Sequence, residues 1–115
     1  MKDLCTNIEK HSKTLDKLKV NMYKDESIKQ ICDLLKVISE PARLKIILAL
    51  NEGELCVNHI VEAVNGNQSA VSHQLRILKD NKVIKSYRQG QSIVYSLMDE
   101  HIMQIINLVK THVEE

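Results

Sequence analysis

Residues 65–79, NGNQSAVSHQLRILK, decide the fold of this 115-residue chain. Asn65-Gly66-Asn67 is a turn signal that separates two segments with apolar residues at helical spacing. We therefore expect one short helix over residues 55–64 and a second over residues 68–79, with Asn81 as its C-cap. The residues of the second helix expected to face inward are Val71, Leu75 and Leu78. Two helices joined by a tight turn that contains glycine are typical of a helix-turn-helix.

Downstream of this motif the sequence changes from helical to alternating periodicity. Residues 83–88 and 92–98 alternate apolar and polar positions around Gln89-Gly90-Gln91, which predicts a β-hairpin. Upstream, Ser39-Glu40-Pro41 separates helices that we expect over residues 27–38 and 43–50. A further amphipathic helix closes the chain. The fold class that we expect is mainly α with a β-hairpin wing, a winged helix-turn-helix that is dimeric through terminal helices.

The chain is short enough to form one domain, and a dimer interface would add to its stability. Residues 1–24 are a lysine-rich arm in which Ile8, Leu15 and Leu18 hint at a short helix. We expect residues 25–115 to form the winged helix-turn-helix domain, with the final helix used for dimerisation.

Cysteine usage and hydropathy bear on the compartment. Three cysteines without framework spacing favour a reducing cytoplasm. Lys2, Asp3 and the polar residues after them do not resemble a signal peptide, and no apolar run is long enough to span a membrane. We therefore expect a cytoplasmic protein. Cys32, close to Ile31 and Leu35, is expected to belong to the core.

The charge is unevenly distributed along a chain whose net charge is only +1. Between residues 68 and 92 five basic residues face Asp80 alone, as expected of a surface that binds phosphates. The second helix of the motif would enter the major groove of double-stranded DNA, and the hairpin tip would reach the flanking backbone or minor groove. The candidate DNA-binding residues are Gln68, Ser69, Ser72, His73 and Arg76 on the helix, and Arg88 and Gln91 at the tip.

The final helix carries four potential metal ligands, Asp99, His101, His112 and Glu115. The two histidines are eleven residues apart, so they share a helix face to within roughly 20° but lie about 16 Å apart along the axis. One zinc ion cannot bridge that distance within a single helix. Two antiparallel copies of the helix would bring opposite ends together and form two sites per homodimer. A simpler interpretation is that these residues are solvated, with Asp99 near the helix N-terminus and His112 at the C-terminal end of its dipole.

Two apolar stripes on the same helix favour the dimer. Ile105 and Leu108 lie between the histidines on one face. The neighbouring stripe consists of Ile102, Ile106, Val109 and Val113. One stripe can cover the core of the chain while the other meets a partner helix.

Four motifs in this order resemble the ArsR/SmtB family of metal-responsive winged-helix repressors. They are PARL at 41–44, ELCV at 54–57, QSAVSHQLR at 68–76 and VYSL at 94–97, within a resemblance that covers residues 27–115. In that family the metal-free dimer binds an operator, and metal weakens the binding. The pattern D-x-H…H-x-x-E matches the zinc-sensing subgroup at each of the four positions of the final helix. The resemblance therefore implies a repressor released by zinc.

The donor set fits that expectation. Two imidazoles and two carboxylates suit zinc or cobalt, and they leave no open position for a hydrolytic water. We therefore do not expect an enzyme or a small organic substrate. His112 could donate its second ring N–H to a backbone carbonyl near Lys82, after the recognition helix, and so carry the metal signal.

The resemblance also implies a second, softer metal site. Some family members bind such a metal through the segment that begins at Glu54 and through cysteines near the N-terminus. Here Asn58 stands where those members have a second cysteine, which leaves Cys56 and His59 at i, i+3, with Cys5 and, more remotely, His11 as partners. Such a site would accept cadmium or lead. The alternative is a small buried Cys56 beside an ordinary surface His59.

Three competing functions remain open at this point. A thiol- or redox-responsive repressor would use Cys56 or Cys5 and carry a vestigial metal site. A zinc-dependent hydrolase lacks a visible open coordination position and a general base. A structural adaptor that only dimerises would leave the basic hairpin unexplained.

Overall fold

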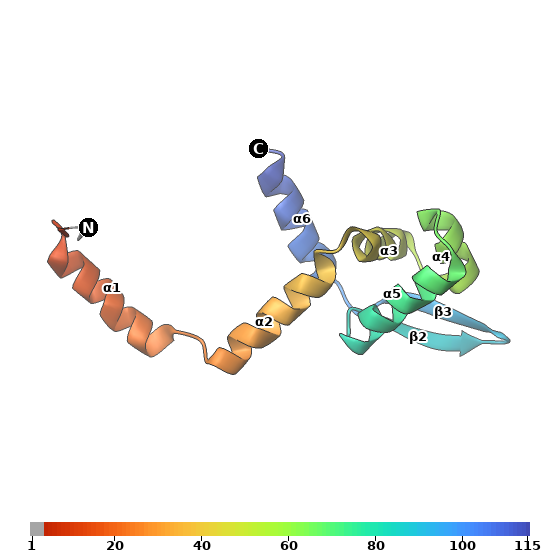
Figure 1. Cartoon of the computed structure of the whole chain (residues 1–115), viewed down its shortest axis with the longest axis horizontal. Coiled ribbons are helices and arrows are strands. Elements are labelled where there is room, and N and C mark those ends of the chain that lie inside the picture. The colour runs from red at the N-terminus through yellow and green to blue at the C-terminus, as the bar shows by residue number, and fades with distance from the viewer. Residues whose placement is uncertain (1–3) are drawn as a thin grey trace. The chain divides into compact units, whose positions relative to one another are not determined.

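The computed structural model describes residues 4–115. Lys2 and Asp3, used above in the argument against a signal peptide, lie outside the described residues. The chain divides into two compact units, residues 1–32 and 33–115. Along the chain the elements shown in Figure 1 are α1 (Ile8–Asn21), α2 (Asp25–Ile38), α3 (Pro41–Glu52), β1 (Leu55–Cys56), α4 (Val57–Val64), α5 (Gln68–Asp80), β2 (Ile84–Gln89), β3 (Ser92–Leu97) and α6 (His101–Val113).

The predicted winged helix-turn-helix is confirmed. Helices α4 and α5 flank the turn at Asn65-Gly66-Asn67, and β2 and β3 form the hairpin. The short helix hinted at in the N-terminal arm is α1. No described helix is both long enough and apolar enough to cross a membrane.

The prediction of a helix over the whole of residues 55–64 was wrong at its first two residues. Leu55 and Cys56 form the short strand β1, which pairs antiparallel with Tyr95 and Val94 of β3. Gly53 ends α3, and the exposed edge of β3 then offers backbone partners that a helical turn at Leu55 would forgo. The hairpin is therefore part of a three-stranded sheet in the order β1-β3-β2.

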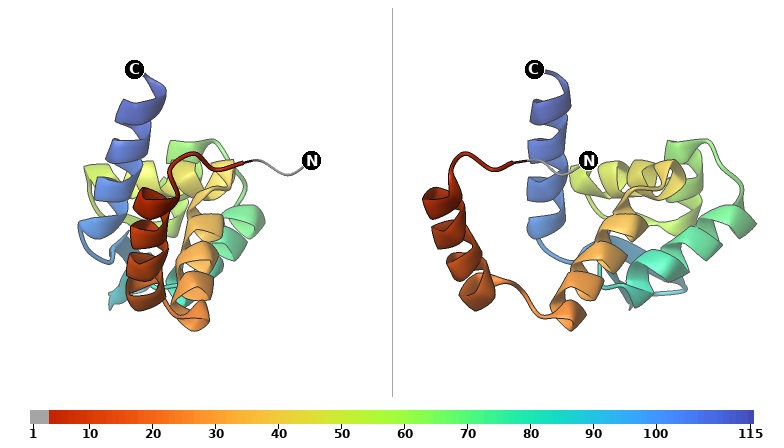
Figure 2. Two further views of the ribbon diagram at one scale, coloured as in Figure 1. Left: turned by 90° about the vertical axis from the view of Figure 1, so that its left-hand side faces the viewer. Right: turned by 60° about the vertical axis from the view of Figure 1, so that its left-hand side comes forward.

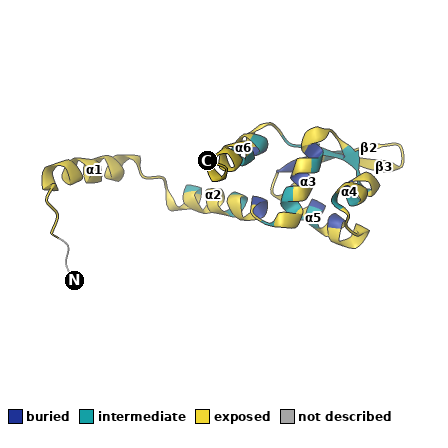
Figure 3. Ribbon diagram, turned by 90° about the horizontal axis from the view of Figure 1, so that it is seen from above, coloured by how far each residue is buried: buried dark blue, intermediate teal, exposed yellow. Residues whose placement is uncertain are grey.

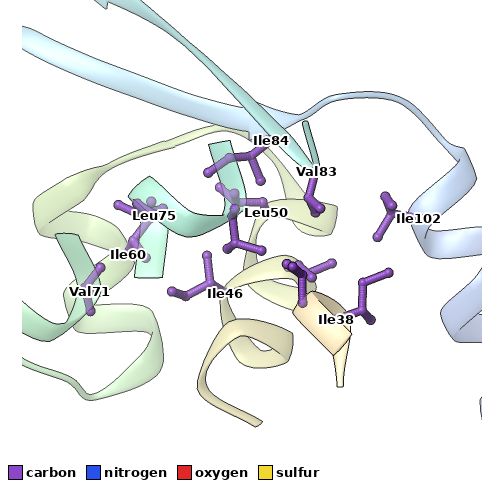
Figure 4. Close-up of a cluster of buried hydrophobic side chains, with 12 residues drawn as sticks. Ile38, Ile46, Leu50, Ile60, Val71, Leu75, Val83, Ile84 and Ile102 are labelled. Atoms are coloured by element: carbon purple, nitrogen blue, oxygen red, sulfur yellow. The ribbon is translucent and has the colours of Figure 1, made fainter. Parts of the chain in front are cut away.

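A single apolar core lies within the unit of residues 33–115. Figure 4 shows side chains from the end of α2, from α3, α4 and α5, from the start of β2 and from the first turn of α6 converging there. Val71, Leu75 and Leu78 of α5 are all buried, as predicted. Each fully buried aliphatic side chain contributes about 1.5–3 kcal/mol relative to its exposed state. The twelve residues of the core are Val37, Ile38, Ile46, Ile47, Leu50, Ile60, Val71, Leu75, Leu78, Val83, Ile84 and Ile102.

Local hydrogen bonds fix the ends of α3 and α5. Glu40 caps α3 by accepting from the backbone N–H of Arg43 at 3.0 Å, with Pro41 in the first turn. Asn81 caps α5, as predicted, and its side-chain amide donates to the carbonyl of Ile77 at 2.8 Å. Lys82 then adopts φ 61°, and the next N–H returns to the carbonyl of Leu78. This left-handed ending directs the chain from the recognition helix into the wing.

The terminal helices leave much of their apolar surface exposed. No residue of α1 is buried, and α6 buries only Ile102 (Figure 3). Within its unit α6 projects from the body formed by α3, α4 and α5, as Figure 2 shows. Consequently the core covers its apolar stripe only as far as the half-buried Ile106, while Val109 and Val113 are exposed together with Leu108.

Cys32 was expected in the core, and that prediction was wrong. Its side chain is exposed on α2, as are those of Ile28, Ile31 and Leu35. The core reaches only the C-terminal part of α2, through the buried Val37 and Ile38 and the half-buried Leu34. Helical periodicity correctly identified an apolar face, but did not reveal that the chain itself leaves this part of the face uncovered.

Candidate nucleic-acid interface and metal ligands

The recognition helix presents the predicted polar residues outward. Asn67 caps α5 by accepting from the N–H of Ala70 at 2.9 Å, which starts the helix immediately before Gln68. The buried face holds α5 on the core and fixes which side faces solvent. On that outward side Gln68, Ser69, Ser72, His73 and Arg76 are all exposed. Their donors and acceptors are therefore free to meet the edges of bases or phosphates.

The turn before the recognition helix requires two special residues. Asn65 adopts φ 52° at the C-terminus of α4, in the left-handed region that asparagine tolerates. At Gly66 a Cβ atom would lie 3.1 Å from a methyl group of Val71 and 3.4 Å from one of Val64. The close approach of α4 and α5 therefore depends on a residue without a side chain.

The wing places Arg88 and Gln91 at its exposed tip. Gly90 turns the hairpin with φ 63°, and Arg88 pairs in register with Ile93. The wing is also tied to the residue before β1, because the hydroxyl of Tyr87 donates to Glu54 at 2.7 Å. That bond to a carboxylate raises the pKa of Tyr87. The sequence did not predict this contact, because the two residues are far apart in the chain and only the β1–β3 pairing brings them together.

A hollow of about 370 Å³ lies between the turn helices and the wing. Its lining combines three predicted DNA contacts, Gln68, Ser72 and Gln91, with Asn58 and Tyr95, which were not predicted. Asn58 is exposed in the first turn of α4, and Tyr95 is half-buried on β3. Both residues belong to this surface because the sheet packs beside α5, which local sequence patterns do not reveal.

The four predicted ligands of the final helix lie in two pairs at its opposite ends. Asp99 accepts from the backbone N–H of His101 at 2.9 Å, and its carboxylate lies 3.1 Å from Nδ1 of the same histidine. The backbone hydrogen bond is the main reason that the pKa of Asp99 is lowered. His112 and Glu115 lie at the other end, about 16 Å away along a helix of this rise. Within residues 4–115 no three His, Cys, Asp or Glu side chains gather in metal-binding geometry.

The cysteines of the predicted second site are each paired with a histidine. Sγ of Cys56 lies 3.2 Å from Nδ1 of His59, across the β1–α4 junction. Sγ of Cys5 lies 2.8 Å from Nδ1 of His11, in the other unit. The structure thus forms two separate thiol–imidazole pairs. His11, the remote candidate, is the direct neighbour of Cys5.

A capped recognition helix, a tight turn and a basic hairpin tip define the class as a winged helix-turn-helix DNA-binding protein. Residues 40–86 match the family described as bacterial regulatory protein, arsR family. The transcriptional repressor SmtB homolog of Synechocystis is 32% identical over 112 residues, which are 97% of this chain and 85% of that protein. The cadmium resistance transcriptional regulatory protein CadC homolog of Staphylococcus aureus is 30% identical over 115 residues, covering 99% and 94%.

The fold is also that of solved winged-helix structures. The homodimeric winged helix-turn-helix DNA-binding domain Mb0332 from Mycobacterium bovis superposes with a TM-score of 0.72 at 24% identity, covering 83% of this chain and 91% of that one. The chain belongs to the arsR family of bacterial regulatory proteins. Its relatives are transcriptional regulators and not enzymes, in agreement with the expectation from the donor set.

Proposed function

We propose that this chain is a metal-responsive transcriptional repressor that acts in the cytoplasm, binds operator DNA as a homodimer and is released when zinc binds between two α6 helices. The observation that carries the proposal is the arrangement of α6. A pre-formed Asp99–His101 pair at one end, His112 and Glu115 at the other, and exposed Leu108 between them match what an antiparallel partner helix would complete. The relatives named as a repressor and as a cadmium-resistance regulator support the same class.

The donor chemistry fits zinc or cobalt. Asp99 and His101 of one protomer and His112 and Glu115 of its partner would supply two imidazole nitrogens and two carboxylates, a closed set for a tetrahedral ion. When bound, the metal would supply a rigid link between the two helices. The exposed apolar residues of α6 would then be covered by the same contact.

The output of the switch would be the relative orientation of the two recognition helices. Operator half-sites lie about one helical turn apart, so a small rotation of each winged domain misplaces both helices. His112 would transmit the change by donating its second ring N–H to a backbone carbonyl near Lys82, where α5 passes into β2. By linkage, if zinc weakens operator binding by some factor, operator DNA weakens zinc binding by the same factor.

The primary test is fluorescence anisotropy of a labelled operator duplex, titrated with protein in the presence of zinc, cadmium or a chelator. We expect tight binding with chelator and a loss of about 5- to 150-fold with zinc. His112→Gln should bind the operator normally and lose the zinc response. Normal release of the variant by zinc would exclude the relay through His112, and a wild-type protein that binds no DNA would exclude the function as a whole.

A mixed dimer tests whether the site spans two chains. Dimers of His101→Gln alone, or of His112→Gln alone, contain no complete site. Random pairing of the two variants makes about half the dimers mixed, and each mixed dimer regains one intact site, so about a quarter of the wild-type zinc capacity should return. No recovery on mixing would contradict a site shared between partners.

For the second site we propose that Cys56 and His59 of one protomer bind a softer ion, such as cadmium or lead, together with Cys5 of the other protomer. His11 is a more remote candidate ligand. Two thiol–imidazole pairs, at 3.2 and 2.8 Å, support it, since thiolate and imidazole donors suit these ions. Cys56→Ser should remove the thiolate-to-cadmium absorption band and leave the zinc response of α6 intact. A full-strength band in the variant would exclude Cys56 as a ligand.

The alternative function is a thiol-responsive repressor that senses oxidation at Cys56 or Cys5, each of which lies beside an imidazole. A thiol-specific oxidant added to the protein–operator complex distinguishes a redox sensor from a metal sensor. Release by oxidant in the presence of chelator, lost in Cys56→Ser or Cys5→Ser, would favour redox sensing. Release only by metal would favour the metal sensor.

A further inference from the structure

The junction between α2 and α3 has a hydrogen-bonding deficit that the sequence itself creates. In a helix the carbonyl of residue 37 accepts from the N–H of residue 41, but residue 41 is Pro41 and has no N–H. The carbonyl of Val37 is instead satisfied by Arg43, whose Nε–H donates to it at 2.7 Å. The Arg43 side chain thus closes the last turn of α2.

The same guanidinium also reaches the recognition helix. Nη1 of Arg43 donates to the side-chain carbonyl of Gln74 at 3.1 Å, across 31 residues of sequence. Gln74 is half-buried on α5, between the buried Val71 and Leu75 and the outward Ser72 and His73. One planar, rigid group therefore joins the C-terminal turn of α2 to the middle of the helix that would read DNA.

The surroundings of Arg43 favour an internal role. The side chain is partly buried at a junction where Glu40 caps α3, and the nearby guanidinium adds to the backbone hydrogen bonds that lower the pKa of Glu40. Its hydrogen bonds run to protein groups on either side. An arginine held in this way is unlike the exposed Arg76 and Arg88, which are free to meet phosphates.

We propose that Arg43 is a positioning residue that sets the orientation of α5 relative to α2 through Gln74, and thereby the fit of the recognition helix in the major groove. The proposal rests on operator binding by the winged domain. It adds two residues, neither of which would touch DNA, to those that determine operator affinity.

The test is a double-mutant cycle on the full-length, chelator-treated protein with a labelled operator duplex. Arg43→Met and Gln74→Met should each weaken operator binding about tenfold, and the double variant by no more than about tenfold, because both remove one shared interaction. Gln30→Met, at an exposed position of α2, is the matched control and should bind as the wild type. Urea unfolding of each variant reports whether it is folded.

Two further measurements separate positioning from other roles. Arg43→Lys keeps the charge but cannot hold both acceptors in a planar fork, so it should bind as weakly as Arg43→Met, with an unchanged slope of log affinity against log salt. If Lys restores binding, or if Arg43→Met lowers the slope by about 0.9, Arg43 is a phosphate contact and the proposal is wrong. If Arg43→Met does not fold, the operator affinity of Gln74→Met alone tests the proposal.

Additive losses in the cycle, or wild-type affinity of Gln74→Met, would also overturn the proposal. Failure of the wild-type protein to bind any duplex would instead overturn the proposed function. The two failures are therefore distinguishable in one set of titrations.

Discussion

The recognition helix α5 and the final helix α6 have the same length and the same kind of amphipathic pattern, but the chain treats their apolar faces differently. In α5 Leu75 is 1% and Leu78 0% exposed. In α6 Leu108 is 72% and Val113 69% exposed, and only Ile102 is buried. A single chain therefore buries the apolar face of α5, whereas it leaves most of the apolar face of α6 exposed.

The same difference extends to the polar residues. The side chains expected to meet DNA are displayed by a helix that is capped, packed and fixed by the core of its own chain. The expected zinc ligands lie in two pairs at opposite ends of α6, and one chain brings no third ligand to either pair within the described residues. Under the proposed function, DNA reading is therefore built into each protomer, whereas metal sensing requires the association of two.

The largest expected effect is on the free energy of unfolding, and it distinguishes the apolar face of α5 from that of α6. Leu75→Ala should lower the free energy of unfolding by about 2–5 kcal/mol, because it leaves a cavity in the core. Leu108→Ala should leave a dilute sample nearly unchanged and reduce the dependence of the unfolding midpoint on protein concentration, since its contacts would be made with a partner. Urea denaturation at two protein concentrations measures both. A large, concentration-independent loss in Leu108→Ala would break the comparison.

Adding and removing metal tests whether the polar residues at the two ends of α6 bind zinc. Zinc that binds only the folded dimer, at about one hundred times its dissociation constant, should stabilise the protein by about 2.7 kcal/mol, and a chelator should reverse the effect. The gain should shrink as the pH falls, because neutral imidazoles and carboxylates are the binding forms. Thermal unfolding with zinc or chelator measures it. His101→Gln is the control, and an undiminished zinc effect in that variant would place the metal elsewhere.

A smaller effect is expected from the wing tip. Arg88→Gln should weaken operator binding and reduce the slope of log affinity against log salt by about 0.9, the value for one lost phosphate contact. The factor by which zinc weakens binding should stay the same, because Arg88 belongs to the reading surface and not to α6. Anisotropy titrations at several salt concentrations, with and without zinc, measure both quantities. An unchanged slope would mean that Arg88 does not contact a phosphate.

The sequence predicted those features that depend on local spacing. The turn at Asn65-Gly66-Asn67, the three buried residues of α5 and the hairpin follow from short-range patterns, and so do the neighbouring pairs Asp99–His101 and Cys56–His59. It did not predict features that need a distant partner. Strand β1 exists only because β3 offers an edge, and the hydrogen bonds from Tyr87 to Glu54 and from Arg43 to Gln74 join residues more than thirty positions apart.

Burial was predicted less well for the same reason. Periodicity reveals that Cys32 and Val109 lie on or beside apolar helix faces, but not how far along each helix the core extends. Both side chains are exposed, and Val109 lies on α6, the helix on which a second chain is proposed to pack. The wrong prediction for Cys32 therefore reflects the extent of the core along α2, which local spacing does not show.

The smallest expected effect compares two carboxylates that precede helices. Glu40 and Asp99 each accept backbone N–H bonds, and these bonds are the main reason that the pKa of each carboxyl is lowered. The folded state of Glu40 therefore holds its proton less tightly than the unfolded chain, whose pKa is near the ordinary 4.5. Its contribution to stability is fully present above that value and is lost as the pH falls through the lowered pKa. Glu40→Gln should remove this pH-dependent contribution.

Urea unfolding of the wild type and Glu40→Gln between neutral and acidic pH measures the difference, which should be well below that caused by Leu75→Ala and should vanish in acid. Asp99→Asn should lose a similar acid-sensitive contribution but also the stabilisation by zinc, which Glu40→Gln should keep. Each of the two carboxylates accepts a backbone N–H at the start of a helix. Their expected responses to zinc differ because Asp99 lies beside the imidazole of His101, at the helix proposed to bind a partner. Glu40 caps α3, whose buried residues pack in the core of its own chain. Equal zinc stabilisation in both variants would remove that distinction and, with it, the assignment of Asp99 as a ligand.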